Sequence, residues 1–465
     1  LNCKSKTMSL IKSISGIRGT IGGQAGHNLT PQDIVECTAA YGAWLLQTGA
    51  APKIVLGRDG RISGPMVGAL VTQTLLALGI EVIDLGLSTT PTVEMAVPRE
   101  QAGGGIILTA SHNPAHWNAL KLLNASGEFI SQADGEAFLA LLQNGGITYA
   151  EVDRLGACRS DDTALDYHVA RILALPDVEV EAVQNRRFRV VVDAVNSTGA
   201  IAMPAILEAL GCEVYILNGE VNGRFAHNPE PLPEHLGGLS EAVRNLGADL
   251  GIAVDPDVDR LALVCEDGSF FGEEYTLVAV SDYILSRRKG NTVSNLSSSR
   301  ALRDVTQQHG GQYFAAAVGE VNVVQKMKSV QAVIGGEGNG GIIVPELHYG
   351  RDALAGAALF LSHLALSGNS ISQLRRRYPD YFMIKDKISL QPDTDMNALL
   401  SQLHEQFRHE SCDVSDGLKI DFADGWVHLR RSNTEPIIRI YAESVSEQRA
   451  LELAERMKGA ALGMS

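Results

Sequence analysis

The stretch that decides the fold is Thr109-Ala110-Ser111-His112-Asn113-Pro114, which directly follows the apolar run Gly105-Ile106-Ile107-Leu108. The apolar run predicts a buried strand, and the polar residues after it predict an abrupt turn. In α/β proteins, a strand that ends in such a turn is where a reactive side chain is presented. A serine in a turn is most often only a turn residue, so a functional role for Ser111 needs support from elsewhere in the chain.

A second polar segment, Asp255-Pro256-Asp257-Val258-Asp259-Arg260, follows the apolar run Leu250-Gly251-Ile252-Ala253-Val254. Alternate residues of an extended segment point to one side, so the three carboxylates are predicted to converge on one hard cation. Three neighbouring acids repel one another unless a cation neutralises them. The alternative is a solvated acidic loop, but the apolar strand before the acids favours a fixed site.

Length and charge limit the class of protein. The 465 residues correspond to about three domains. A hydrophobic content of 45% and a charged content of 20% are ordinary for a soluble globular chain. The net charge of −15 argues against a nucleic-acid partner, because phosphate backbones require a basic surface. A small phosphorylated substrate stays possible, because a local cluster of arginines can override the global charge.

Cysteine usage and hydropathy indicate the compartment. The six cysteines are scattered without CxxC spacing, which favours buried free thiols in a reducing cytoplasm over a metal site. No stretch approaches the ~18 uninterrupted apolar residues of a membrane span. Lys4 and Lys6 near the start have no apolar run behind them, so they do not indicate a signal peptide. We therefore predict a cytoplasmic protein with no membrane partner.

Helices and strands alternate from the start of the chain. Thr30 as N-cap and Pro31 at the first helical position predict a helix to about Gly49. A strand is predicted over 53–56, a polar turn over 57–61, and then a helix to Gly79. A strand over 81–85 completes the unit. This alternation is typical of a mainly parallel sheet covered by helices.

The same unit recurs along the chain. Leu75–Val82 matches Leu207–Val214, with a glycine ending the helix in both. The repeat indicates tandem βαβ lobes, and a third lobe is predicted over about 261–370. The last ~90 residues differ, because a strand pair around Asp424-Gly425 and an amphipathic helix from about Ser446 predict a smaller α+β unit.

The predicted plan is therefore three similar α/β lobes with mixed, mostly parallel sheets and a C-terminal α+β lid. The polar stretch Arg375–Asp380 is the predicted linker before the lid. The predicted domains are residues 8–155, 156–260, 261–372 and 380–465.

The serine and aspartate segments together resemble the α-D-phosphohexomutase superfamily, and the resemblance covers nearly the whole chain from Met8. It implies a heart-shaped, four-domain architecture, in which the serine carries a phosphoryl group beside a magnesium ion. Ser111 would be that phosphoserine, His112 and Asn113 would contact its phosphate, and Arg260 would lie beside it. The implied ligands of Mg²⁺ are Ser111, Asp255, Asp257 and Asp259. The family usually has glycine where Val258 stands.

A glycine-rich loop, Gly335-Gly336-Glu337-Gly338-Asn339-Gly340-Gly341, follows the apolar residues Ala332–Ile334. Glycine runs are by default flexible loops, but a loop at a strand's end is where substrates bind in such folds. The resemblance implies that Glu337 and Asn339 bind sugar hydroxyls. The common form of this loop has serine at the Asn339 position and histidine at Gly341. We hypothesise that His348 replaces the missing histidine.

A second loop near the C-terminus, Arg430-Arg431-Ser432-Asn433-Thr434-Glu435-Pro436, follows the predicted strand Trp426–Leu429. It could be a solvated hairpin end. Its hydroxyls, amide and guanidinium would also make a phosphate cradle. The resemblance implies that the substrate's non-reacting phosphate is gripped by Arg430, Ser432, Asn433 and Thr434. Because one grip must accept either end of the sugar, the last domain is predicted to move.

Two smaller pieces complete the resemblance. Gly16-Ile17-Arg18-Gly19-Thr20 is similar to the family's N-terminal loop, in which the arginine positions the reacting phosphate. Lys121 matches the lysine that acts as acid and base there, although a lone lysine is normally only a solvated surface residue. The family's glycine at the position of Ala119 is absent.

The resemblance implies a phosphohexomutase, an isomerase that moves phosphate between C6 and C1 through phospho-Ser111 and a bisphosphorylated sugar. Glucosamine 6-phosphate is the expected substrate, from the length and the compact third domain, with mannose or glucose phosphate as the alternative. Glu337-Gly338-Asn339 matches neither the common glucosamine form of the loop nor its common mannose/glucose form. Rival readings are a magnesium-dependent phosphatase and a non-catalytic sugar-phosphate sensor. The protein is expected to be a monomer or homodimer.

Overall fold

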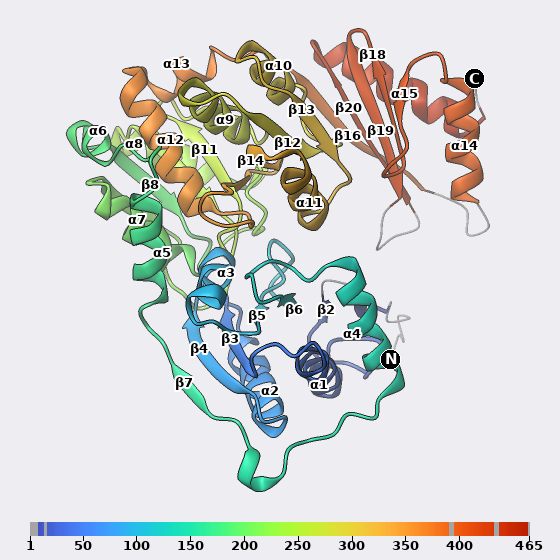
Figure 1. Ribbon diagram of the computed structural model, residues 1–465. Coiled ribbons are helices and arrows are strands. Elements are labelled where there is room, and N and C mark those ends of the chain that lie inside the picture. Colours follow the sequence, from blue (N-terminus) through green and yellow to red (C-terminus); the bar gives the residue numbers. More distant parts are fainter. Residues whose placement is uncertain (1–7, 14–15, 390–394, 432–436, 464–465) are drawn as a thin grey trace, which may run out of the picture. The chain divides into compact units, whose positions relative to one another are not determined.

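The computed structural model describes residues 8–13, 16–389, 395–431 and 437–463 (Figure 1). These residues form two compact units. Unit 1 comprises Leu1–Thr276 with Asn339–Leu374, and unit 2 comprises Leu277–Gly338 with Arg375–Ser465. Three mixed, mostly parallel α/β sheets are followed by one C-terminal antiparallel sheet, so the predicted fold class is confirmed.

The first sheet of unit 1 has seven strands in the order β1-β2-β6-β5-β3-β4-β7. The strands β5, β3, β4 and β7 are parallel neighbours, whereas β1, β2, β6 and β5 pair in antiparallel fashion. Their bounds are β1 Ile11–Ser13, β2 Gly16–Thr20, β3 Lys53–Arg58, β4 Glu81–Leu87, β5 Gly104–Leu108, β6 Trp117–Leu123 and β7 Cys158–Ser160.

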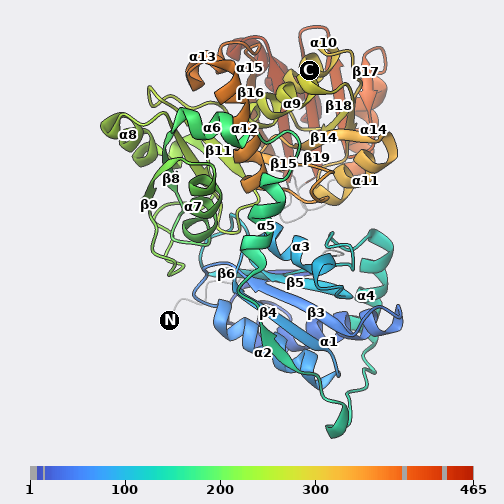
Figure 2. The same ribbon diagram turned by 60° about the vertical axis from the view of Figure 1, so that its left-hand side comes forward.

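Helices cover both faces of this sheet (Figure 2). Ile54 and Leu56 of β3 belong to the core beneath α1 and α2, whereas Val55 belongs to the core beneath α3, as strand alternation requires. Thr30 caps α1 as predicted, through a capping box with Asp33. The helices are α1 Pro31–Gln47, α2 Gly64–Ala77, α3 Thr90–Arg99 and α4 Gln132–Asn144, followed by the 3-10 helix η1 Val152–Arg154.

The second sheet of unit 1 has the order β11-β10-β8-β9, in which only the β10–β11 pair is antiparallel. The repeat in the sequence corresponds to a structural repeat, because Gly79 and Gly211 end their helices with φ of 78° and 73°. The strands are β8 Arg189–Asp193, β9 Glu213–Leu217, β10 Leu250–Val254 and β11 Leu261–Cys265. The helices are α5 Ala164–Leu173, α6 Val180–Arg186, α7 Gly199–Ala209, α8 Gly237–Leu246 and η2 Pro233–His235.

Unit 2 begins with the core of the third lobe. Strand β12 pairs in parallel with both β13 and β14. The elements are β12 Asn291–Asn295, β13 Tyr313–Ala316, β14 Ala332–Glu337, α9 Tyr275–Arg287, α10 Ala301–Gln308 and α11 Glu320–Val330. The chain then returns to unit 1 with β15 Gly341–Ile343, α12 Ala353–Ser367 and α13 Ile371–Arg375. Strand β14 extends to Glu337, so the glycine-rich stretch begins inside the strand and not after it.

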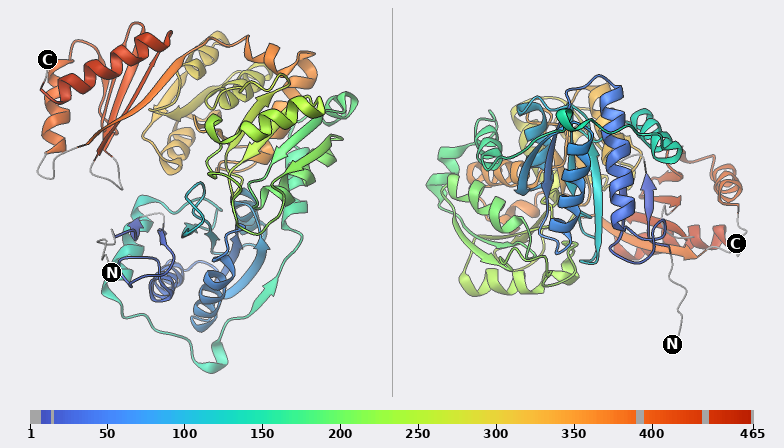
Figure 3. Two further views of the ribbon diagram at one scale, coloured as in Figure 1. Left: turned by 180° about the vertical axis from the view of Figure 1, so that it is seen from behind. Right: turned by 90° about the horizontal axis from the view of Figure 1, so that it is seen from below.

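The C-terminal part of unit 2 is an antiparallel sheet in the order β16-β20-β19-β18-β17. Helices α14 and α15 cover one face of it and share one core with the strands (Figures 1 and 3). The predicted strand pair at Asp424-Gly425 and the helix after Ser446 are confirmed. The elements are β16 Phe382–Ser389, α14 Met396–Gln406, β17 Ser411–Asp413, β18 Leu418–Phe422, β19 Gly425–Arg431, β20 Ile437–Ser444 and α15 Glu447–Ala461.

Within the predicted linker Arg375–Asp380, Tyr378 is buried, and its hydroxyl donates to Asp282 Oδ2 at 3.0 Å. Cys37, Cys212 and Cys265 are buried free thiols as expected, but Cys158 is exposed on the edge strand β7. Among the described residues, every helix is too short or too polar to cross a membrane.

Candidate active site

Ser111 is presented by the turn that follows β5. The strand is fully buried up to Leu108, and Ser111 adopts a left-handed backbone conformation with φ of 48°. Its backbone N–H donates to Thr109 Oγ1 at 2.9 Å, and the Asn113 N–H donates to the Ala110 carbonyl at 3.0 Å. A positive φ is uncommon for a non-glycine residue and marks a position that its surroundings hold in place.

Arg61 stabilises this turn through hydrogen bonds. Its guanidinium is fully buried and pairs with Asp59, with Nε 2.9 Å from Oδ2. Asp59 Oδ2 in turn accepts a hydrogen bond from the Thr109 hydroxyl at 2.7 Å. The guanidinium also donates to four backbone carbonyls of the serine loop: Ser111 at 2.5 Å, Asn113 at 2.7 Å, Pro114 at 2.8 Å and Trp117 at 2.9 Å. Such a network leaves the turn little freedom.

From the sequence only a polar turn is predicted over Gly57–Arg61, and this role of Arg61 is not predicted. A signal was present, because this turn follows a buried strand just as the serine turn does. Strands β3 and β5 are parallel neighbours, so the turns that follow them lie at the same edge of the sheet. The register of the two strands could not be known from the sequence.

The aspartate triplet (Asp255, Asp257 and Asp259) follows β10. All three side chains are completely buried, and one carboxylate oxygen from each lies within 4.8 Å of those of the other two. They converge for a different reason from the one predicted, because the segment is a turn and not an extended chain. The N–H groups of Asp259 and Arg260 both donate to Asp255 Oδ1 at 3.2 Å. Val258 supplies the turn with φ of 61°, where the family usually has glycine.

The triplet lies directly beside the serine. The Ser111 hydroxyl donates to Asp255 Oδ2 at 2.7 Å. The first turn of α3 holds Asp257, since the Thr90 N–H donates to the Asp257 carbonyl at 2.9 Å and the Thr90 hydroxyl donates to Oδ2 at 2.6 Å. The Ser111 hydroxyl from the first lobe and the carboxylates from the second lobe therefore lie together within unit 1.

The triplet is suited to a divalent cation. Among the described residues, Oδ1 of Asp257 and Oδ1 of Asp259 are buried without a hydrogen-bond partner. Burial, together with the charges of Asp259 and Asp257, raises the pKa of Asp255 well above its ordinary value. Buried carboxylate oxygens with unused acceptor capacity and mutual repulsion match the all-oxygen ligand set that Mg²⁺ prefers.

Lys121 is the first cation that faces the triplet. It lies on β6 opposite Ile107 of β5, so antiparallel pairing brings it to the serine strand. Its Nζ is 2.8 Å from Asp257 Oδ2 and 3.5 Å from Asp259 Oδ2. Although burial opposes it, the pull of Asp257 and Asp259 raises the pKa of Lys121 above its ordinary value. A divalent cation on the same carboxylates would offset that pull.

Arg260 and His112 lie on the other side of Ser111. Arg260 Nη2 donates to His112 Nδ1 at 2.8 Å, and Nη1 lies 3.2 Å from Glu230 Oε1. Burial, with the neighbouring charges of Arg260 and Arg351, lowers the pKa of His112 to about 2. His112 is therefore neutral near pH 7, with Nδ1 3.3 Å from the Ser111 hydroxyl oxygen. Arg260 thus contacts His112 of the serine loop.

Arg18 and Asn339 also belong to unit 1. Arg18 lies on β2 opposite Ala119 of β6, two residues from Lys121. Directly opposite residues share a face of the sheet, and so do residues two apart in one strand. Arg18, Ala119 and Lys121 are therefore on the same face. Asn339 Oδ1 accepts a hydrogen bond from the Gly341 N–H at 3.3 Å, which closes a tight turn before β15.

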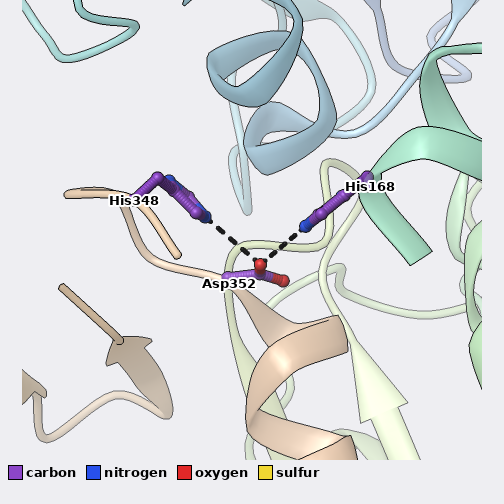
Figure 4. A group of neighbouring side chains, drawn as sticks. All are labelled: His168, His348 and Asp352. Atoms are coloured by element: carbon purple, nitrogen blue, oxygen red, sulfur yellow. Dashed lines mark hydrogen bonds and ion pairs between the residues drawn. The ribbon is translucent and has the colours of Figure 1, made fainter. Parts of the chain in front are cut away.

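His348 lies in a buried group with His168 and Asp352 (Figure 4). Asp352 Oδ2 is 2.8 Å from His168 Nε2 and 3.2 Å from His348 Nε2. The other ring nitrogens lie 3.0 Å from Thr92 Oγ1 and 3.3 Å from Glu94 Oε2, respectively. Although burial opposes it, the neighbouring carboxylates of Asp352 and Glu94 raise the pKa of His348 to about 10.

We interpret this group as a hydrogen-bonded charge network and not as a metal site. The nitrogen–oxygen separations are those of hydrogen bonds. Ligands of a tetrahedral zinc ion, each about 2.0–2.1 Å from the metal, would lie farther apart than the 2.8 Å between His168 and Asp352. Both ring nitrogens of His348 face carboxylates of this network. A proton-transfer role for His348 stays a prediction.

The other predicted site residues belong to unit 2 or lie outside the described residues. Glu337 is buried and accepts hydrogen bonds from Asn295 Nδ2 at 2.9 Å and from the Gly319 N–H at 3.2 Å. Arg430 Nε lies 3.4 Å from Asp416 Oδ2. The remaining predicted phosphate contacts, Ser432, Asn433 and Thr434, lie outside the described residues.

Four family models match the chain in order. They are the phosphoglucomutase/phosphomannomutase alpha/beta/alpha domains I, II and III, at residues 10–145, 166–268 and 272–381, and the C-terminal domain at residues 385–460. A phosphoglucomutase/phosphomannomutase from Thermococcus kodakarensis is 36% identical over 444 residues, which cover 94% of this chain and 96% of the relative. A probable phosphoglucosamine mutase from Methanopyrus kandleri is 35% identical and covers 95% of both chains.

The fold also matches a solved structure. The X-ray structure of a phosphoglucomutase/phosphomannomutase family protein from Burkholderia thailandensis has a TM-score of 0.85 at 24% identity, covering 99% of this chain and 98% of that one. The serine beside a buried aspartate triplet, the four matching domains and the full-length relatives point to one conclusion. The chain belongs to the phosphoglucomutase/phosphomannomutase family of the α-D-phosphohexomutase superfamily and is a phosphohexomutase, an isomerase that transfers a phosphoryl group within a hexose phosphate.

Proposed function

We propose that the protein interconverts glucosamine 6-phosphate and glucosamine 1-phosphate through phospho-Ser111, with Mg²⁺ held by Ser111 and the aspartate triplet. The observation that carries the proposal is the 2.7 Å contact between the Ser111 hydroxyl and Asp255 Oδ2, beside two buried carboxylate oxygens without hydrogen-bond partners among the described residues. When bound, Mg²⁺ would withdraw negative charge from the transferring phosphoryl group.

Ser111 is the phosphoryl carrier in this cycle. The bond between the Ser111 Oγ and phosphorus breaks, and a new bond forms between phosphorus and a hydroxyl oxygen of the sugar phosphate. The resulting bisphosphate reorients, and its other phosphoryl group returns to Ser111. Arg61 keeps the serine oxygen fixed throughout, since its guanidinium binds four carbonyls of the loop. Fixed geometry of this kind is a main source of rate enhancement in phosphoryl transfer.

Lys121 moves the proton that the transfer requires. In its neutral form the amine accepts the proton of the attacking sugar hydroxyl, and as the ammonium it returns a proton to the oxygen that is released, so protons balance over the cycle. Its contact with Asp257 Oδ2 at 2.8 Å places the amine at the triplet. Arg18, Arg260 and His112 contact the oxygens of the reacting phosphate, where donors stabilise developing charge. His112 is held by the 2.8 Å hydrogen bond from Arg260.

Substrate recognition is assigned to two loops. Glu337 and Asn339 bind sugar hydroxyls, and His348 is the candidate to replace the family's histidine at Gly341. The non-reacting phosphate is bound by Arg430, Ser432, Asn433 and Thr434. Support for these roles is the resemblance of the loops to those of the family, together with the buried carboxylate of Glu337.

Glucosamine phosphate is our first choice of sugar. The name of the Methanopyrus relative supports it. Mannose or glucose phosphate is the second candidate, because a relative of similar identity is called a phosphoglucomutase/phosphomannomutase. A coupled assay that compares kcat/KM for the three 6-phosphates decides between them. We expect the highest value for glucosamine 6-phosphate, and a higher value for either neutral sugar would reverse the assignment.

A second readout tests the type of reaction. Inorganic phosphate is measured in the same samples, because a phosphatase would release it while a mutase conserves it. We expect isomer formation to exceed phosphate release by a large factor. Release of phosphate without an isomer would contradict the proposed cycle.

A further inference from the structure

Arg351 contacts the aspartate triplet, and neither the sequence motifs nor the proposed cycle gives it a role. Its Nη2 donates to Asp259 Oδ2 at 2.7 Å, and its side chain is 10% exposed. It comes from the segment between β15 and α12, within unit 1. We propose that Arg351 is a positioning residue of the metal site, which fixes Asp259 so that its Oδ1 remains available to Mg²⁺. This inference rests on the proposed function, because it assumes that the triplet binds Mg²⁺.

The backbone around Arg351 is anchored to the aspartate loop itself. The Ala353 N–H donates to the Val258 carbonyl at 3.2 Å, and the Leu261 N–H donates to the Gly340 carbonyl at 3.0 Å. An antiparallel bridge joins Arg351 to Ile343. Backbone hydrogen bonds at Gly340 and Ala353, on either side of Arg351, therefore join this segment to the C-terminal half of the turn that forms the triplet, and they place the arginine relative to Asp259.

The charge network of Figure 4 fixes the next residue. Asp352 Oδ1 caps α12 by accepting from the Leu354 and Ala355 N–H groups at 2.8 and 3.1 Å. Asp352 Oδ2 binds His168 and His348. With all its acceptors in use, Asp352 cannot shift without breaking several buried hydrogen bonds. The network thereby fixes the backbone next to Arg351.

Gly341 provides the space that the Arg351 side chain fills. A Cβ atom on Gly341 would lie 2.3 Å from Arg351 Cδ and 3.0 Å from Cγ. Both distances are too short for a side chain to be present without moving the arginine. Gly341 lies in β15, so the requirement is for space and not for an unusual backbone conformation. The observed position of the Arg351 side chain therefore requires glycine at position 341.

The two oxygens of Asp259 have different surroundings. Oδ2 receives Arg351 at 2.7 Å and Lys121 at 3.5 Å, whereas Oδ1 is buried with no hydrogen-bond partner among the described residues. The two cations thus occupy one oxygen and leave the other for a ligand. Outer-shell groups that orient a ligating carboxylate are worth about 10- to 100-fold in metal affinity.

This role makes a prediction that a simple charge effect does not. Removing a nearby cation would by Coulomb's law strengthen Mg²⁺ binding, whereas losing the orientation of Asp259 weakens it. We measure Mg²⁺ affinity by calorimetric titration of the full-length protein. We expect about 10- to 100-fold weaker binding in Arg351→Ala. Arg351→Lys should fall in between, because lysine keeps the charge but lacks the planar fork.

Gly341→Ala is the decisive variant, because it keeps every charge of the site. We expect it to weaken Mg²⁺ binding as Arg351→Ala does, and the double variant should be no weaker than Arg351→Ala alone. Gly238→Ala, in open space on α8, is its control. Arg159→Ala, which removes an exposed arginine paired with Glu81 and Glu100, is the control for lost charge.

The outcomes separate this inference from the proposed function. If the wild type and Asp257→Asn bind Mg²⁺ equally, the triplet is not the metal site and both proposals fail. If Asp257→Asn alone loses binding while Arg351→Ala binds as tightly as the wild type or more tightly, only the role of Arg351 is overturned. Gly341→Ala that behaves like Gly238→Ala also overturns it. Circular dichroism of each variant checks that the fold is retained, and Arg351→Lys and Gly341→Ala test the inference if Arg351→Ala does not fold.

Discussion

The hydroxyl of Ser111 donates a hydrogen bond of 2.7 Å to Asp255, which is 144 residues away in the sequence. The contact joins the turn after β5 to the turn after β10, from two different sheets of unit 1. A phosphoryl group on Ser111 would add about two negative charges beside three buried carboxylates. Such an arrangement is stable only with a cation between the phosphate and the acids. The contact therefore supports both the carrier role of Ser111 and the magnesium site.

Replacing Ser111 tests the carrier role directly. We expect Ser111→Ala to lose phosphoryl labelling from a labelled hexose bisphosphate and to lower kcat by at least about a thousandfold. The measurement is radiolabel retained by the protein, together with isomer formation. Ser126→Ala, at an exposed serine in the loop after β6, should label and turn over like the wild type. Undiminished labelling of Ser111→Ala would place the phosphoryl carrier elsewhere.

Arg61 is predicted to control the order of the serine loop. In Arg61→Lys the charge beside Asp59 is kept, but an ammonium cannot reach all four carbonyls that the guanidinium binds. We expect faster hydrogen exchange over residues 109–117 and a fall in kcat of up to about a hundredfold, because misplacement by ~1 Å has that effect. Arg159→Lys on the surface is the matched control. Unchanged exchange in Arg61→Lys would show that the loop is ordered by other contacts.

Val258 combines complete burial with a φ of 61°, which is strained for a β-branched residue. At an ordinary position, glycine is less stable than alanine by about 0.5–1 kcal/mol. At position 258 we expect the glycine variant to be more stable than the alanine variant. Only Val258→Gly relieves the strain of the left-handed conformation, which is about 1–2 kcal/mol. Thermal unfolding should therefore give a higher Tm for Val258→Gly than for Val258→Ala. At Val254, in the regular strand β10, alanine should be the more stable replacement. If the alanine variant had the higher Tm at both positions, Val258 would not be strained.

His428 in unit 2 predicts a pH dependence of stability. It is fully buried on β19, with Nε2 2.6 Å from the Asp416 carbonyl oxygen and Nδ1 2.9 Å from Ser297 Oγ. Burial lowers the pKa of His428 to about 4, whereas in the unfolded chain it is about 6.5. Between these values the unfolded state binds more protons, so stability is lost as the pH falls from about 6.5 to about 4.

The measurement is the free energy of unfolding of unit 2 against pH, followed by hydrogen exchange of β18 and β19. We expect His428→Gln to flatten the slope by at most about 1.4 kcal/mol per pH unit within that window. His404→Gln, at an exposed histidine of α14, should keep the slope of the wild type. Equal slopes in wild type and His428→Gln would mean that His428 is already protonated in the folded protein or does not titrate in this window.

Local signals determined most of the secondary structure. The capping box at Thr30, the apolar run before Ser111 and the glycines at 79 and 211 act within a few residues of themselves, so their structural effects follow from the sequence. The convergence of the three aspartates was expected for the wrong reason. The alternation of the aspartates suggested an extended segment. The turn at Val258 was not predicted, because valine does not signal a left-handed position as glycine would.

The sequence by itself determined the candidate residues for the chemistry, because the segments around Ser111 and the aspartate triplet each follow a recognisable buried strand and together resemble the family's motifs. Only the tertiary structure showed which residues hold them in place. Arg61, Thr90 and Arg351 reach the site through strand register and loop packing between segments far apart in the chain, and no local pattern encodes those distances. The physical reason is that side-chain identity and periodicity are local properties, whereas the contacts that orient a carboxylate or a hydroxyl depend on how separate elements pack against one another.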